Sequence, residues 1–209
     1  MRSSSLVVLA LALVAPTSLL VACGDDGGGG GNENEVITTV ALTFTPAGGG
    51  AAIVAEFDDP DGDGGAAPTI DALGLVAGTT YDTTVRFQNK LETPAEEITD
   101  EIRDESDQHQ LFFTGSAVDG PAAAHPGAPL VHAYADTDAN LLPVGLANTF
   151  TVGSGTPGDL TVTLRHMPPV NGAAVKTAAA AMTVRDGGFA ALGGETDAQV
   201  TFSVAIAVP

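Results

Sequence analysis

The sequence predicts an all-β fold, an antiparallel immunoglobulin-like β-sandwich of about eight strands with one short acidic helix. From residue 36 onward, short apolar segments alternate with polar residues at a period of two, which is typical of half-buried strands. Turns rich in glycine, proline and aspartate separate these segments. Only one segment, near residue 100, has apolar residues at helical spacing.

The first two strands are predicted over residues 36–44 and 51–57, and the proline and glycines of 46–50 form the turn of a hairpin. A third strand follows around 81–87. Five more are predicted over residues 110–114, 130–135, 148–152, 160–166 and 199–208. The last one has a continuous inward stripe made of Val200, Phe202, Val204, Ile206 and Val208.

The helix is predicted over residues 94–105, about three turns long. Thr93 is placed to cap its start, Pro94 suits the first helical position, and Glu96 completes a capping box. The apolar stripe consists of Leu91, Ala95, Ile98 and Ile102. Residues 171–194 give conflicting indications, because the alanines of 178–181 favour helix whereas two glycine pairs favour loop.

The N-terminal segment has the features of an export signal. Arg2 gives residues 1–22 a positive end, an apolar run follows, and Ala22 is a small residue before the expected cleavage point. Leu20, Val21, Ala22 and Cys23 resemble the lipobox of bacterial lipoproteins. This resemblance implies cleavage before Cys23, with a diacylglyceryl group on its sulfur and an acyl chain on the new amine.

Three parts are therefore expected: a signal peptide (1–22), a lipidated cysteine with a glycine-rich tether (23–35) and a β-sandwich domain (36–209). Cys23 is the only cysteine, so no disulfide forms within the chain. We expect a lipid-anchored protein of the cell envelope, at the outer membrane, because Gly24 rather than an aspartate follows the anchor.

The composition limits the partners of the chain. With 26 acidic against 7 basic residues, the formal charge of −19 repels nucleic acid and attracts divalent cations. Tryptophan is absent and tyrosine is scarce, which disfavours a carbohydrate module. The alternative for the acidic residues is that they only keep the domain soluble.

Two acidic turns resemble calcium loops. Asp59, Asp61 and Asp63, followed by a glycine, match the start of such a loop, where alternate carboxylates converge on one ion. Asp136, Asp138 and Asn140 repeat the spacing without the glycine. Calcium is the expected cofactor, and the alternative is an acidic turn whose residues suit the backbone geometry.

Catalytic motifs are not found. Of the four histidines, His109 starts a predicted strand and His166 ends one, so a zinc or copper site from this pair is an alternative to ordinary strand-end residues. The sequence has neither an H-E-x-x-H motif nor a G-x-S-x-G elbow. We therefore expect no enzymatic activity.

A series of segments spread over residues 36–197 resembles a group of short uncharacterised lipoproteins of Gram-negative bacteria. These segments are VITTV (36–40), FDDPDGDG (57–64), TPAEEIT (93–99), HQLFF (109–113), DTDAN (136–140), PVGL (143–146), LTVTLRH (160–166) and GGETD (193–197). Some members are labelled as type 1 periplasmic binding fold proteins. That label implies alternating strands and helices in two lobes, whereas the pattern along this chain predicts strands.

The sequence thus favours a non-enzymatic binding or structural module that presents a surface to an unknown protein or small-molecule ligand. One alternative is a periplasmic receptor for a sugar or another small molecule. The other is a metal-dependent enzyme, which requires His109 and His166 to lie within ligand distance of each other or of the acidic loops.

Overall fold

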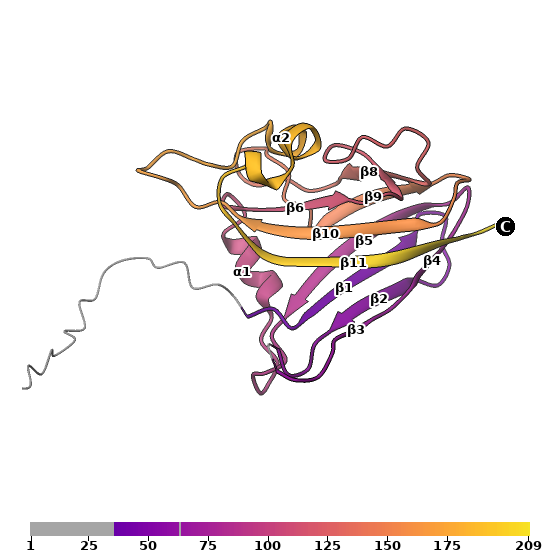
Figure 1. Cartoon of the computed structure of the whole chain (residues 1–209), viewed down its shortest axis with the longest axis horizontal. Coiled ribbons are helices and arrows are strands. Elements are labelled where there is room, and N and C mark those ends of the chain that lie inside the picture. The colour runs from indigo at the N-terminus through magenta and orange to yellow at the C-terminus, as the bar shows by residue number, and fades with distance from the viewer. Residues whose placement is uncertain (1–35, 63) are drawn as a thin grey trace, which may run out of the picture. The chain divides into compact units, whose positions relative to one another are not determined.

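The computed structural model describes residues 36–62 and 64–209, in which most of the regular structure is strand. Seven strands form one sheet, in the order β3 (Thr69–Ile70), β2 (Ile53–Asp58), β1 (Thr39–Pro46), β5 (Thr80–Gln88), β9 (Ala147–Val152), β8 (Leu130–Tyr134) and β7 (Val118–Asp119). Four form a second sheet, in the order β4 (Leu73–Val76), β11 (Glu195–Ala207), β10 (Gly158–His166) and β6 (His109–Thr114). The prediction of a mostly β fold is confirmed (Figure 1).

The alternating pattern in the sequence corresponds to alternating burial. In β5, Tyr81, Thr83, Val85 and Phe87 are all buried, and the residues between them are exposed. The predicted hairpin is confirmed, because β1 and β2 pair antiparallel across the turn after Pro46. Gly49 in this turn has a φ of 87°, a left-handed conformation that glycine adopts without strain.

One hydrophobic core contains side chains of both sheets. Val40, Leu42 and Phe44 come from the seven-stranded sheet, and Leu164 and Phe202 from the four-stranded one. Phe113 of β6 packs edge-on against Phe150 of β9, with ring centroids 5.5 Å apart. Each such buried side chain stabilises the fold by about 1.5–3 kcal/mol, so this shared core is what holds the two sheets together.

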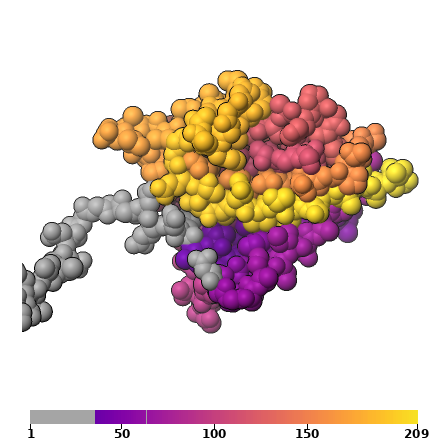
Figure 2. Space-filling model, in the orientation of Figure 1, coloured from indigo at the N-terminus to yellow at the C-terminus, as the bar shows by residue number. Residues whose placement is uncertain are grey.

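The outer face of β10 and β11 is polar. Thr161 and Thr201 share a hydrogen bond of 2.8 Å across the two strands. Figure 2 shows β11, in yellow, along the visible surface of the molecule. The predicted inward stripe of β11 is confirmed for Val200, Phe202 and Val204, but Val208 lies beyond the end of the strand and is 87% exposed.

The helix α1 (Ile98–Asp104) is shorter than predicted, and the predicted capping box is absent. Glu97, not Thr93, is the N-cap residue, and its side chain makes no capping bond. The backbone of Glu96 instead pairs with Asn89 through two hydrogen bonds of 3.0 and 3.1 Å. This pairing extends the edge of β5 and delays the start of the helix.

A second helix, α2 (Ala180–Gly187), lies in the segment 171–194, whose residues favour both helix and loop, and a 3₁₀ turn, η1 (Phe189–Ala191), follows it. Ala180, Ala181 and Val184 pack with Phe112 and Met167 on the other side of β6. Packing on this apolar patch accounts for a helix that ends at the first glycine pair. Among the described residues, no helix has the length and apolar character needed to cross a bilayer.

The prediction that every strand pair is antiparallel is wrong for two pairs of short strands. β4 runs parallel to β11, and β7 runs parallel to β8. Both short strands are at sheet edges and are joined to their neighbours by long connections rather than by hairpins. Two-residue strands such as β3 and β7 are too short to show a period of two.

Candidate functional site

Several predicted site residues lie outside the described residues. These are Cys23, with the signal peptide (1–22) and the tether (23–35), and Asp63 of the first acidic turn. Lipidation and the complete first calcium loop stay predictions.

The described part of the first acidic turn follows β2. Asp61 accepts a hydrogen bond from the backbone N–H of Ala66 (3.1 Å), and the N–H of Gly62 donates to the carbonyl of Asp59 (3.3 Å). The neighbouring Asp58 forms an ion pair with Lys90, whose Nζ lies 2.7 Å from the Asp58 carboxylate. The same Nζ lies 2.7 Å from the carboxylate of Glu56. The backbone thus forms a tight turn here, which is compatible with a calcium loop and with an acidic turn without metal.

The carboxylates of the second acidic turn are held by donors from the protein itself. Asp136 accepts hydrogen bonds from the backbone N–H groups of Gly145 (2.7 Å) and Ala147 (2.9 Å). Asp138 accepts from the N–H groups of Asn140 (2.8 Å) and Leu142 (2.9 Å). Asn140 itself is exposed. These contacts fix the loop 136–147, and calcium binding there stays a prediction.

Asp138 also forms the one ion pair in the described residues whose two side chains are fully buried. Lys176 Nζ lies 2.9 Å from its carboxylate, with no solvent exposure of either side chain, and donates to the carbonyl of Ser106 at 2.7 Å. Burial alone would raise the pKa of Asp138, but Lys176 and the backbone N–H groups hold it below its ordinary value. One lysine thus ties the loop 136–147 to the connection between α1 and β6.

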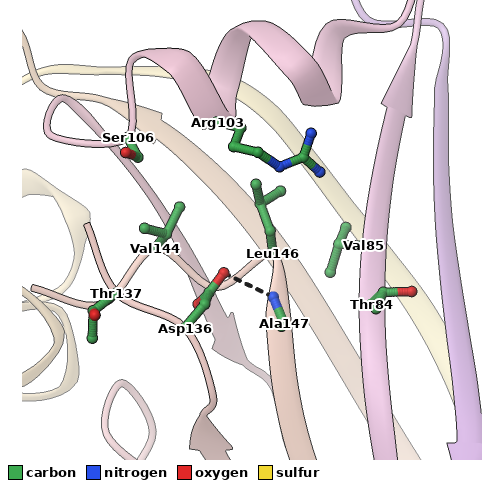
Figure 3. A pocket seen from close by; sticks show the side chains of 9 residues that line it. All are labelled: Thr84, Val85, Arg103, Ser106, Asp136, Thr137, Val144, Leu146 and Ala147. Carbon is green, nitrogen blue, oxygen red and sulfur yellow. Dashed lines mark hydrogen bonds between the residues drawn. The ribbon is translucent and has the colours of Figure 1, made fainter. Parts of the chain in front are cut away.

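A pocket of about 370 Å³ lies between these two tied segments (Figure 3). Arg103 of α1 and Ser106 line one side of it, and the loop 136–147 lines the other. The lining residues are Thr84, Val85, Arg103, Ser106, Asp136, Thr137, Val144, Leu146 and Ala147. The pocket forms next to Ala147, the first residue of β9. On this side β5 pairs with β9 only as far as Thr84, whereas its other edge stays paired with β1 up to Gln88.

The pocket combines two opposite charges with an apolar wall. Figure 3 shows Leu146 between Arg103 and Asp136, with Val144 and Val85 on either side of Leu146. Arg103 also pairs with the neighbouring Asp100 on α1. Asp136 keeps acceptor capacity beyond its two backbone bonds, because an ionised carboxylate has about four lone-pair sites.

A second cluster brings together the two histidines singled out in the sequence. His109 and His166 are opposite each other in β6 and β10, and their rings stack with centroids 4.5 Å apart and an interplanar angle of 9°. The carboxylate of Glu105, just after α1, completes a group whose ligand atoms lie within 4.8 Å of one another. The metal-enzyme alternative required this proximity of the two histidines.

Burial shifts the ionisation of the groups around this cluster. Burial lowers the pKa of His109, against the hydrogen bond from its Nδ1 to the carbonyl of Glu105. Asp197, a neighbour of His166 in the adjacent strand, has its pKa raised to about 6 by burial, although the charges of His166 and Arg165 oppose this shift. Its Oδ2 is buried without a hydrogen-bond partner among the described residues.

Sequence reasoning missed the pocket, the Lys176 contacts and the role of Glu105. Lys176 is a single lysine in an alanine-rich segment, and no motif marks its pairing with Asp138. Glu105 belonged to the predicted acidic helix, where many carboxylates look equivalent. Glu105 differs from the other carboxylates of this segment because the chain leaves the helix at this residue, and its carboxylate lies near His109 and His166.

Comparison of the chain with protein-family models, with curated proteins and with solved structures finds no match.

Proposed function

We propose that the chain is a lipid-anchored, non-enzymatic binding module of the cell envelope. Its domain holds a small zwitterionic molecule with an apolar body in the pocket between α1 and the loop 136–147. The anchor at Cys23 and an outer-membrane location follow from the lipobox resemblance. For the domain itself we propose an immunoglobulin-like sandwich, supported by the core that both sheets share.

The observation that carries this proposal is the preorganised pocket. Lys176 bonds to both of its sides, through Ser106 and through Asp138. Asp136 clamps the loop 136–147 through the N–H groups of Gly145 and Ala147. A ligand that enters such a pocket orders little additional structure, so more of its interaction energy becomes affinity.

The charges of the pocket indicate the ligand class. The guanidinium of Arg103 suits a carboxylate, with which it can form two parallel hydrogen bonds. Asp136 suits an ammonium group, and the wall of Val144 and Leu146 suits the apolar body between the two charges. A zwitterion has no net charge, so the overall charge of −19 does not repel it.

The test is calorimetric titration of the purified full chain with the free amino acids and a set of dipeptides. We expect at least one of these probes to bind, and Arg103→Gln to weaken that binding by about 10–100-fold, the usual loss for a charged hydrogen bond. Arg185→Gln is the matched control, because Arg185 is also a basic residue in the last turn of a helix, paired with a neighbouring aspartate.

Unchanged affinity in Arg103→Gln would overturn the proposed ligand class. Failure of every zwitterionic probe to bind would do the same.

A further inference from the structure

The pairing of β6 with β10 brings the side chains of His109 and His166 close together. Met167 N donates to Gln108 O at 2.7 Å, so Gln108 and Met167 form a hydrogen-bonded pair of this antiparallel ladder. The next pair along, His109 and His166, is therefore a non-hydrogen-bonded pair, in which opposed side chains approach most closely. His109 lies on the same face of β6 as Leu111, and His166 lies on the same face of β10 as Leu164. Both leucines belong to the hydrophobic core.

Each histidine of this pair has a ring nitrogen that can act as a ligand. His109 Nδ1 lies 3.1 Å from the carbonyl of Glu105, and a carbonyl only accepts, so Nδ1 carries the proton. In the neutral ring, Nε2 then has a free lone pair, and a backbone carbonyl that fixes the tautomer is typical of metal-ligating histidines. His166 Nε2 is buried and has no hydrogen-bond partner within residues 36–62 and 64–209.

Glu105 supplies a third donor from an exposed position. Its side chain is exposed, whereas His109 is buried, and its carboxylate joins the two imidazoles within 4.8 Å. Neighbouring donors in a tetrahedral zinc site are ~3.3 Å apart. Closing this difference requires the exposed Glu105 to rotate and the stacked rings of His109 and His166 to turn out of their parallel arrangement, so that their in-plane lone pairs converge on one ion.

We propose that Glu105, His109 and His166 bind one divalent transition-metal ion, with zinc the best match, and that water fills the fourth position. Two imidazoles and one carboxylate suit zinc, copper and nickel, whereas calcium and magnesium prefer oxygen donors alone. The negative charge of the chain concentrates cations around the domain. This inference goes beyond the zwitterion pocket and does not depend on it.

The experiment uses the untagged full chain, stripped of metal by chelator and titrated with zinc by calorimetry. We expect one zinc per chain, bound at least a hundred-fold more tightly than calcium or magnesium. His166→Phe keeps a ring to stack on His109 but removes both nitrogens, so we expect it to weaken zinc binding more than a hundred-fold. Since Glu105 is exposed, Glu105→Gln leaves the fold intact, and we expect a loss of at least ten-fold.

The matched control is His125→Gln, at an exposed histidine away from the cluster, for which we expect unchanged binding. Cobalt in place of zinc gives a second readout, because tetrahedral cobalt absorbs strongly in the visible region and His166→Phe should abolish that absorption. Zinc binding that persists in both Glu105→Gln and His166→Phe would assign the metal to surface carboxylates and overturn the proposal. Absence of zinc binding in the unaltered chain would also overturn it.

Discussion

At the scale of single residues, the core of this protein contains polar groups in defined roles. His132 lies among Phe113, Tyr134 and Phe150, and its Nε2 is 3.0 Å from the side-chain oxygen of Asn148. Asn148 donates its amide to the carbonyl of Gly145 at 2.7 Å, so its oxygen faces the histidine as an acceptor. The sequence predicted the strand that carries His132 but not this contact, because strand periodicity does not show which partner a buried side chain meets.

His132 makes stability depend on pH. Burial lowers its pKa from 6.5 to about 4, although the hydrogen bond with Asn148 opposes this shift. Above pH 6.5 neither the folded nor the unfolded chain protonates this ring, and its contribution to stability is complete. As the pH falls from 6.5 towards 4, the unfolded chain binds the proton and the folded chain does not, so the free energy of unfolding decreases.

We expect the unaltered chain to lose about 2 kcal/mol more stability between pH 7 and pH 5 than His132→Gln loses. Urea unfolding at both pH values measures this difference, in which the titration of all other groups cancels. His125→Gln, at an exposed histidine, should retain the pH dependence of the unaltered chain. Equal losses in the unaltered chain and His132→Gln would contradict the assignment.

At the scale of elements, α1 covers the part of β5 that β9 leaves unpaired. Thr99 Oγ1 accepts a hydrogen bond from the N–H of Phe87 (2.8 Å) and lies 3.2 Å from its carbonyl. Ile98 and Ile102 enter the main core on the same side of the helix. The helix is therefore held by one buried hydroxyl and two apolar side chains.

Thr99→Val removes the hydroxyl and keeps the shape of the side chain. We expect it to lower the free energy of unfolding by about 1–3 kcal/mol, because the buried N–H of Phe87 loses its partner. Hydrogen exchange at Phe87 should accelerate together with this loss. Thr99→Ser keeps the hydroxyl and should lose clearly less, so equal losses in the two variants would assign the effect to packing alone.

The sequence predicted the strands of the core well, because β1, β5 and β11 each show apolar residues at a period of two. It predicted less of α1, since the capping motif at Thr93 competes with the pairing of Glu96 and Asn89. It left α2 open, because that helix depends on contact with Phe112, which is remote in sequence. The histidine pair was foreseen as strand ends, with a zinc or copper site as the alternative, and the calcium loop at Asp59, Asp61 and Asp63 stays a prediction.

At the scale of the whole domain, Lys176 connects parts of the chain that are far apart in sequence. It bonds to Ser106, after the helix that docks on β5, and to Asp138, in the loop between β8 and β9. Breaking one side of such a buried pair leaves the other charge without a partner. The ion pair therefore matters for stability and for the shape of the pocket together.

Lys176→Met should lower the free energy of unfolding by about 3–5 kcal/mol, the usual cost of an unpaired buried charge. The double variant Lys176→Met with Asp138→Asn removes that charge and keeps an oxygen for the N–H groups of Asn140 and Leu142, so we expect it to recover part of the loss. Chemical denaturation of the unaltered chain and both variants checks this. A double variant no more stable than Lys176→Met would contradict an electrostatic origin.

The edge strands of the two sheets affect whether neighbouring copies of the domain can pair with each other. The seven-stranded sheet ends in the two-residue strands β3 and β7. On β6, the N–H of Leu111 donates to the carbonyl of Val144 (2.7 Å), and the hydroxyl of Tyr134 donates to the carbonyl of Leu111 (2.8 Å). Short or covered edges give a neighbouring copy few backbone groups with which to extend a sheet. Copies of the domain brought close together would thus remain individual molecules instead of polymerising through β3, β7 or β6.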